Sequence, residues 1–207
     1  MLVLASASPR RRELLSLLGV EFEVRPVDVD EDAGASADPL IVARKLARIT
    51  AEAARLADEE CTIIAADTVV HFEGDLLAKP ADAADARRML ERLRGNTHLV
   101  VTAVALMLPG RLSALIRHPL TQITMRDYTE AEIAASIERG DPFDKAGGYA
   151  IQDAAMSPVA RYEGCYCNVV GLPLWSLLEL MRKAGMPLDV APEQLLPQCA
   201  ACPLGPR

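Results

Sequence analysis

The chain alternates short apolar runs with longer segments whose apolar positions recur every three or four residues. Apolar runs rich in β-branched residues predict strands, whereas the three-to-four spacing predicts amphipathic helices. The expected strands cover residues 2–5, 22–29, 61–72, 98–108, 114–125 and 159–162. The expected helices cover residues 9–18, 39–57, 81–93, 129–140 and 173–184. This order predicts a mixed α/β chain with long strands joined by hairpins.

Polar and turn-forming residues mark where several of these elements begin and end. Ser8 can cap a helix that has Pro9 at its first position. The Pro-Gly pair at 109–110 separates two long apolar runs and predicts that they form an antiparallel pair. Thr129 and Glu132 have the spacing of a capping box, which supports a helix beginning there.

Length and composition predict one globular unit followed by a tail. With 207 residues, of which 51% are hydrophobic and 25% charged, the chain can bury a core of its own. We expect residues 1–186 to form a single domain with two lobes. Residues 187–207 contain prolines and cysteines without clear periodicity, which predicts an extended arm or a partly disordered segment.

Charge and hydropathy narrow the classes of partner. No run approaches the roughly 20 apolar residues that span a bilayer, and arginines come too early for a secretory signal. We therefore expect a cytoplasmic protein without a membrane partner. The net charge of −7 argues against a general nucleic-acid binder, which would display a broad basic face. A small anionic ligand fits a local basic site better than nucleic acid does.

The five cysteines do not predict a disulfide framework, because their number is odd and the chain can build a core without cross-links. Reduced thiols are expected. Cys165 and Cys167 together with Cys199 and Cys202 leave one alternative open. These four soft ligands would close a structural zinc site if the tail folded back; otherwise they are loop thiols and part of a loose tail.

The stretch ASASPRRREL places three consecutive arginines at the start of a predicted helix. The helix dipole favours acidic residues there, so Arg10, Arg11 and Arg12 call for an anion to offset them. Backbone N–H groups, the hydroxyls of Ser6 and Ser8 and the adjacent arginines are groups that bind phosphate. The alternative is a solvated basic face on which Ser8 is an ordinary helix cap.

Asp67 lies inside the apolar run TIIAADTVV. An ionised carboxylate in such a strand is costly unless it is paired, binds a metal or faces a cleft. A functional carboxylate and a strand-end residue that caps a turn are both compatible with this pattern.

Two lysines and two glycine-bearing loops add further candidates. The chain has four lysines and eighteen arginines, and Lys79 and Lys145 both lie in loop-like contexts. A lysine where arginine is the usual choice hints at a compact point charge for a phosphate, although surface lysines are common. The loops DKAGGYAIQD and GCYCNVVGLPL carry Gln152 and Asn168, whose amides can read the edge of a base.

The ordered set LASASPRR, Glu31, AADTVV, LAKP, VTAVAL, DKAGGYAIQ and NVVGLPL resembles the Maf family, nucleotide pyrophosphatases related in fold to the inosine-triphosphate pyrophosphatases. The resemblance runs from residue 2 to about residue 184. It implies a strongly curved mixed sheet between two α/β lobes with a central nucleotide cleft, and a homodimer. It also implies hydrolysis of a nucleoside triphosphate to the monophosphate and pyrophosphate.

The resemblance assigns roles to individual residues. Asp67 matches the proton acceptor of the family. Arg10, Thr68 and Gln152 match positions tied to base selection and are similar to those of the subgroup that acts on dTTP and UTP. A sister subgroup that acts on 7-methylguanosine triphosphate carries tryptophan where this chain has Arg10. Thr50 departs from the pattern, because the family often has a lysine at that place.

The chemistry of the reaction suggests the remaining assignments. We expect Mg²⁺ or Mn²⁺ held by Glu31 and Asp67, because hard cations take oxygen ligands. Arg11, Lys79 and Lys145 would neutralise the rest of the triphosphate, with Ser8 at the phosphate-binding helix start. Two alternatives remain: turnover of another nucleotide such as CTP or 7-methylguanosine triphosphate, and a non-catalytic nucleotide-binding regulator of septum formation.

Overall fold

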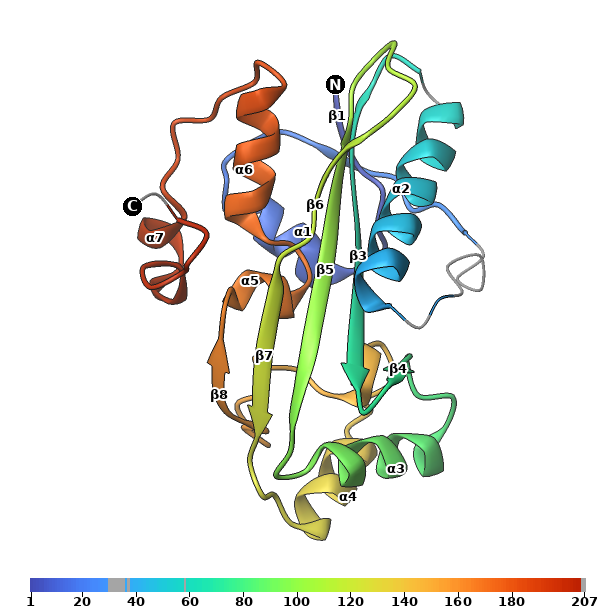
Figure 1. Cartoon of the computed structure of the whole chain (residues 1–207), viewed down its shortest axis with the longest axis vertical. Helices are drawn as coiled ribbons and strands as arrows, with labels where there is room; N and C mark the ends of the chain where they lie inside the picture. The colour runs from blue at the N-terminus through green and yellow to red at the C-terminus, as the bar shows by residue number, and fades with distance from the viewer. Residues whose placement is uncertain (30–35, 37, 58, 206–207) are drawn as a thin grey trace.

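The computed structural model describes residues 1–29, 36, 38–57 and 59–205, which form a mixed α/β fold (Figure 1), as expected. The described strands join in one mixed sheet with the order β2-β1-β3-β5-β7-β8, in which β4 pairs with β3 and β6 with β5. The strands are β1 (Leu2–Leu4), β2 (Glu23–Val24), β3 (Thr62–Phe72), β4 (Asp75–Leu77), β5 (Thr97–Met107), β6 (Leu115–Arg117), β7 (Leu120–Met125) and β8 (Val159–Glu163). The α-helices are α1 (Pro9–Ser16), α2 (Pro39–Ala57), α3 (Ala83–Leu93), α4 (Glu130–Glu138), α5 (Tyr166–Val170), α6 (Leu174–Lys183) and α7 (Pro192–Leu195).

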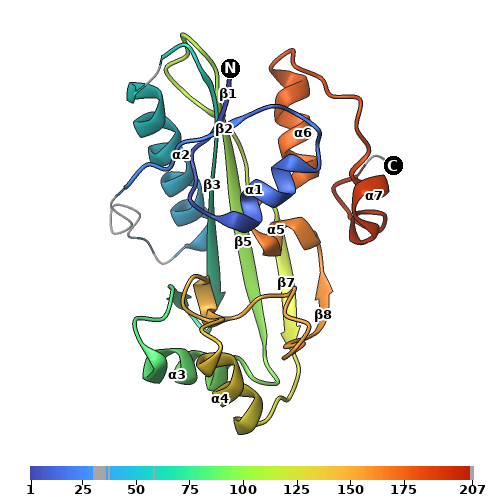
Figure 2. The same cartoon turned by 180° about the vertical axis from the view of Figure 1, so that it is seen from behind.

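Strands β3 and β5 form the centre of the sheet and are buried on both faces. They pair antiparallel over nine residue pairs, from Ile63 with Met107 to His71 with Leu99. Successive side chains of a strand point to opposite faces, so Ile64 packs on the side of α1, α5 and α6 while its neighbour Ile63 packs against α2. Figures 1 and 2 show these helices on opposite sides of the two strands. The continuous apolar runs of the sequence reflect this two-sided burial.

A third cluster closes the end of the sheet at which α3 and α4 lie. Leu90 and Leu93 of α3 and Ile133 of α4 are fully buried there with Tyr128, whose hydroxyl donates to the Leu90 carbonyl at 2.6 Å. The capping box expected from the sequence begins α4, with the Thr129 hydroxyl and the Glu132 carboxylate each bonded to the other's backbone N–H.

Within the described residues, no helix is both long enough and apolar enough to span a membrane.

Two of the expected strands are shorter or divided in the structure. The strand expected over 22–29 pairs only at Glu23–Val24, because its parallel partner β1 is itself only three residues long. The strand expected over 114–125 is divided into β6 and β7. Pro119 lies at the break, and a proline has no N–H to donate to a strand ladder.

The described part of the tail differs from the expected arm. It forms α7 and a short 3₁₀ turn, η3 (Pro197–Cys199), beside α6 (Figures 1 and 2). Leu188, Val190 and Leu195 pack against the core cluster that contains α6, because burial of these apolar side chains offsets the lack of regular structure. Sequence periodicity misses such a segment, since its apolar residues follow neither a helical nor a strand repeat.

The folded tail brings four thiols together. Cys167 Sγ and Cys199 Sγ lie 3.4 Å apart, and Cys165 contacts both Cys167 and Cys202. All five cysteines of the chain are buried, and none of them forms a disulfide in the structure. The hydrogen bond with Cys167, together with burial, raises the pKa of Cys165 to about 12. Among the described residues, no group of three or more histidine, cysteine or acidic side chains has the arrangement of a metal site.

His98 is buried in the sheet with a single polar partner among the described residues. Its side chain is 2% exposed, and its Nε2 lies 2.6 Å from the hydroxyl of Tyr149. Its Nδ1 has no hydrogen-bond partner within the described part of the chain. Burial lowers the pKa of His98 to about 4, from an ordinary value of 6.5, so this ring stays neutral in the folded protein at neutral pH.

This burial predicts a loss of stability in mildly acidic solution. Below pH 6.5 the unfolded chain protonates His98 and the folded protein does not, so the free energy of unfolding falls as the pH drops towards 4. We expect the wild type to lose about 2 kcal/mol more between pH 7 and pH 5 than His98→Gln, as measured by urea unfolding. The pKa values of Glu132 and Glu179 are lowered to about 2, so the titration of these carboxylates reduces the free energy of unfolding only below pH 4.5. Equal slopes for both proteins would contradict this role of His98.

Candidate active site

A cavity of about 820 Å³ lies beside the middle of β3. Its wall is built from segments that are far apart in the sequence: the β1–α1 loop, the inner face of α2, the centre of β3, the segment after β4 and the glycine-bearing loops. The main lining segments are residues 5–11, 66–70, 76–79, 144–146, 149–152 and 169–170, together with Val42, Leu46 and Thr50 of α2. Eight of the described site candidates from the sequence line this cavity: Ser8, Arg10, Arg11, Asp67, Thr68, Lys79, Lys145 and Gln152. Glu31 lies outside the described residues.

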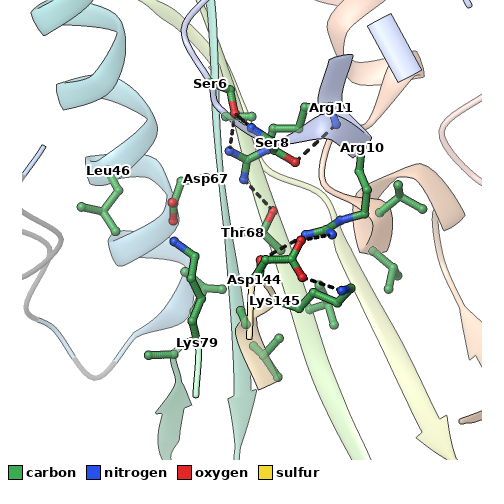
Figure 3. A pocket seen from close by; sticks show the side chains of 18 of the residues that line it. Ser6, Ser8, Arg10, Arg11, Leu46, Asp67, Thr68, Lys79, Asp144 and Lys145 are labelled. Carbon is green, nitrogen blue, oxygen red and sulfur yellow. Dashed lines mark hydrogen bonds and ion pairs between the residues drawn. The ribbon is translucent and has the colours of Figure 1, made fainter. Parts of the chain in front are cut away.

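Ser6 and Ser8, which precede α1, shape the start of this helix. The sequence predicts Ser8 as its cap. The Ser8 hydroxyl caps the helix by accepting from the backbone N–H of Arg11 at 3.4 Å, and Pro9 occupies the first turn. The Ser6 hydroxyl accepts from the backbone N–H of Ser8 at 3.2 Å. These local bonds shape the loop and the helix N-terminus, both of which line the cavity (Figure 3).

Arg11 connects three separate parts of the site. Its Nε donates to the carbonyl of Gly171 at 2.9 Å, while its two terminal nitrogens donate to the hydroxyls of Ser6 at 3.2 Å and Thr68 at 3.1 Å. Gly171 has a φ of 119°, and a Cβ there would lie 3.4 Å from both the Arg11 Nε and the Thr68 Oγ1. Glycine at this position lets the backbone come close to the guanidinium. Arg11 thus supports the site by fixing its wall.

Arg10 points in another direction, towards a carboxylate that the sequence reading missed. One terminal nitrogen of Arg10 donates to Asp144 Oδ2 at 2.7 Å, and the other donates to the Asp144 carbonyl at 3.2 Å (Figure 3). Lys145 also donates to the Asp144 carboxylate. Burial opposes ionisation of Asp144, but the hydrogen bonds from Lys145 and Arg10 outweigh it and lower its pKa. Arg10 and Lys145 therefore face the cavity with Asp144 as their counter-ion. The sequence signal for this counter-ion is that Asp144 directly precedes Lys145.

Asp67 and Thr68 are adjacent in β3, opposite Ala103 and Thr102 of β5. Both are half-buried and line the cavity. Figure 3 shows the Lys79 side chain extending towards Asp67 from the segment after β4. A carboxylate in the middle of a central strand thus lies at the cavity wall with a lysine directed at it, rather than capping a turn at a strand end.

Gln152 and Asn168, the two amides of the glycine-bearing loops, lie in different environments. Gln152 is exposed and lines the cavity. Asn168 is fully buried, and its side chain bonds to Thr102, Val100 and Thr121. The structure therefore does not support the expectation that Asn168 reads a base directly, because a buried amide must satisfy its hydrogen bonds inside the protein.

Comparison with known proteins identifies the family of the chain. The family model described as Maf-like protein matches residues 1–184. The chain belongs to the Maf family. The match covers every element from β1 to α6 and all the candidate residues, and ends before the tail.

Several Maf relatives of this chain carry the same name, dTTP/UTP pyrophosphatase. The protein of that name from Thermomicrobium roseum is 49% identical over 207 residues, covering 99% of this chain and 94% of the relative. Those from Deinococcus radiodurans and Citrifermentans bemidjiense are 44% and 42% identical over 89% of this chain and 93% and 95% of the relatives. Among solved structures, a HAM1 protein from Coxiella burnetii aligns with a TM-score of 0.41 and 20% identity over 61% of this chain and 73% of that chain.

The three bonds of Arg11 generate a prediction about stability. Lysine keeps the charge but places one ammonium where Arg11 reaches three separate oxygens. We expect Arg11→Lys to lower the free energy of unfolding by about 2 kcal/mol in urea titrations. The matched control is Arg12→Lys, an exposed position on the same helix, which should change stability by less than about 0.5 kcal/mol. Equal stability of the two variants would show that the Arg11 bonds contribute little.

Proposed function

We propose that this Maf protein hydrolyses dTTP and UTP to the monophosphate and pyrophosphate. The observation that carries the proposal is the relative named dTTP/UTP pyrophosphatase that is 49% identical over 99% of this chain. Because the identity extends over the whole described fold, it includes every element that builds the cavity. The proposed role is removal of unwanted or modified pyrimidine nucleotides in the cytoplasm.

The charges of the cavity suit a triphosphate. Arg10, Lys79 and Lys145 line one cavity together with the start of α1, whose backbone N–H groups and dipole favour anions. Arg10 and Lys145 are both bonded to Asp144. We propose that a bound phosphate competes with this carboxylate for the two cations, so that ligand binding redistributes ion pairs rather than neutralising bare charges.

Asp67 is the proposed general base. Hydrolysis between the α- and β-phosphates needs a water in line with the leaving pyrophosphate and a group that takes its proton. Asp67 is the carboxylate in the centre of β3 at the cavity wall, and the paired strand holds it in a fixed position. Figure 3 shows the Lys79 side chain directed at this carboxylate.

The cavity also suits the hard divalent cation expected from the family. Asp67 supplies a carboxylate oxygen, and Mg²⁺ is commonly held by one or two carboxylates together with substrate phosphates. Asp67 would hold the ion together with Glu31, which precedes α2, a helix that lines the same cavity. When bound, Mg²⁺ or Mn²⁺ would neutralise developing phosphate charge.

Three side chains are proposed to select the base. Arg10, Thr68 and Gln152 reach the cavity from α1, β3 and the loop before β8. They belong to different segments, so together they can contact a base from more than one side. The alternative substrates, CTP and 7-methylguanosine triphosphate, differ from UTP at the base that these residues would contact.

The first test is pyrophosphate release by the purified protein across a nucleotide panel with Mg²⁺ or Mn²⁺. The panel contains dTTP, UTP, CTP, the purine triphosphates and 7-methylguanosine triphosphate. We expect selective turnover of dTTP and UTP. If the protein prefers another nucleotide, the proposed pyrophosphatase reaction stands and the proposed substrate is wrong. Binding without any turnover would instead favour the non-catalytic regulator.

The proposed role of Asp67 predicts a specific kinetic defect. Asp67→Asn keeps the size of the side chain but removes the base, so kcat should fall by about 10²- to 10⁴-fold. Nucleotide affinity, measured by calorimetry, should persist. The matched control Asp189→Asn makes the same change at an exposed residue of the tail and should retain wild-type turnover. Normal turnover by Asp67→Asn would exclude Asp67 as the base.

A further inference from the structure

A continuous chain of hydrogen bonds leads from the buried core to Thr68 at the cavity wall. The Oγ1 atoms of Thr68 and Thr102 lie 2.9 Å apart, and the Thr102 Oγ1 donates to the backbone carbonyl of Asn168 at 2.6 Å. Thr102 and Asn168 are both fully buried. Thr102 and Asn168 therefore have no access to water, and their protein partners decide the direction of the bonds that they make.

The direction of the bond between the two threonines follows from Asn168. A carbonyl oxygen only accepts, so the one hydroxyl hydrogen of Thr102 points to the Asn168 carbonyl. Thr102 has no second hydrogen for Thr68. The hydrogen between the two hydroxyls must come from Thr68, which therefore donates into the core.

The side chain of Asn168 is fixed in the same way. Its Oδ1 accepts from the backbone N–H of Thr102 at 2.7 Å, and its Nδ2 donates to the Val100 carbonyl at 2.9 Å. One partner can only donate and the other can only accept, so the amide has one possible orientation. The Thr121 hydroxyl donates to the Cys165 carbonyl at 3.1 Å and can thus accept from Nδ2 at 2.9 Å. Every donor in this group has an acceptor.

These bonds leave Thr68 with a restricted capacity for a ligand. A hydroxyl has one hydrogen and two lone pairs. The hydrogen is used by Thr102, and one lone pair accepts from the Arg11 guanidinium at 3.1 Å. The remaining group at the cavity wall is a lone pair, so Thr68 presents an acceptor and no donor.

We propose that the Asn168–Thr102 pair makes Thr68 an obligate hydrogen-bond acceptor, which selects pyrimidine bases that carry a hydrogen on N3 and discriminates against cytosine. Uracil and thymine carry a hydrogen on N3, whereas N3 of cytosine is itself an acceptor. An acceptor facing an acceptor leaves both groups unpaired in a desolvated site, which costs affinity. The inference rests on the proposed function and adds to it the base atom that is recognised, which is N3. Thr102 and Asn168 are positioning residues, because they act through Thr68.

The test is the ratio of affinities for UMP and CMP, measured by calorimetry, in the wild type and in variants of Thr102. Thr102→Val keeps the shape but removes the hydroxyl, so the Thr68 hydrogen can turn to the cavity and donate. We expect the UMP-to-CMP affinity ratio to fall about tenfold, which corresponds to about 1.4 kcal/mol. Thr102→Ser retains the hydroxyl and should keep the wild-type ratio. A general packing defect would lower both affinities without changing their ratio.

A second variant tests the same idea at the cavity wall, where folding is less at risk. Thr68→Val removes the acceptor and should lower the affinity for UMP while leaving that for CMP nearly unchanged; Thr68→Ser should behave as the wild type. An unchanged ratio in Thr102→Val or in Thr68→Val would overturn the inference. So would a wild type with no preference for UMP.

These outcomes separate the inference from the proposed function. If the wild type releases pyrophosphate from UTP but the ratio does not respond to the variants, the function stands and the inference fails. If the ratio responds as expected but no nucleotide is hydrolysed, the acceptor role of Thr68 stands and the proposed hydrolysis fails.

Discussion

The antiparallel pairing of β3 and β5 is the constraint on which the rest of the structure depends. Each residue from Ile63 to His71 is held opposite a partner on β5, and both strands are covered by helices on their two faces. Asp67 and Thr68 lie in the middle of this ladder. A strand that pairs with β5 along one edge, and with β1 and β4 at the two ends of its other edge, cannot shift one residue without breaking many contacts. The two polar residues are therefore held rigidly while the segments around them supply the cavity.

The paired strands also explain how the arginines at the start of α1 are tolerated. Neighbours on a helix diverge by about 100°, because 3.6 residues make a turn. Arg11 points to the sheet and bonds to oxygens of Ser6, Thr68 and Gly171, whereas Arg10 points to Asp144. Two of the three positive charges that oppose the helix dipole, those of Arg10 and Arg11, thus meet acceptors from other segments. The same contacts hold the cavity wall together, so the charge of the site and its shape have a common origin.

In this site the direction of the hydrogen bonds is fixed as well as the position of the side chains. A threonine hydroxyl in water donates or accepts with equal ease, so its residue type says little about what it recognises. Burial of Thr102 and Asn168 removes that freedom, because each buried group must pair with the partners that the core provides. The core therefore has an electrostatic role in addition to its packing role. It connects the inner side of β5 to the surface that a base would meet.

The sequence by itself determined the alternation of strands and helices, the caps of α1 and α4, the family and eight of the residues that line the cavity. These features depend on local periodicity, on hydrogen bonds within a few residues or on ordered motifs. Only the tertiary structure decided that Asp144 pairs with Arg10 across 134 positions and that Arg11 reaches Gly171 across 160. It also decided that Asn168 is buried and that the tail folds back and places Cys199 against Cys167. Such contacts arise where segments distant in sequence share a core, and local patterns carry no record of which segments will meet.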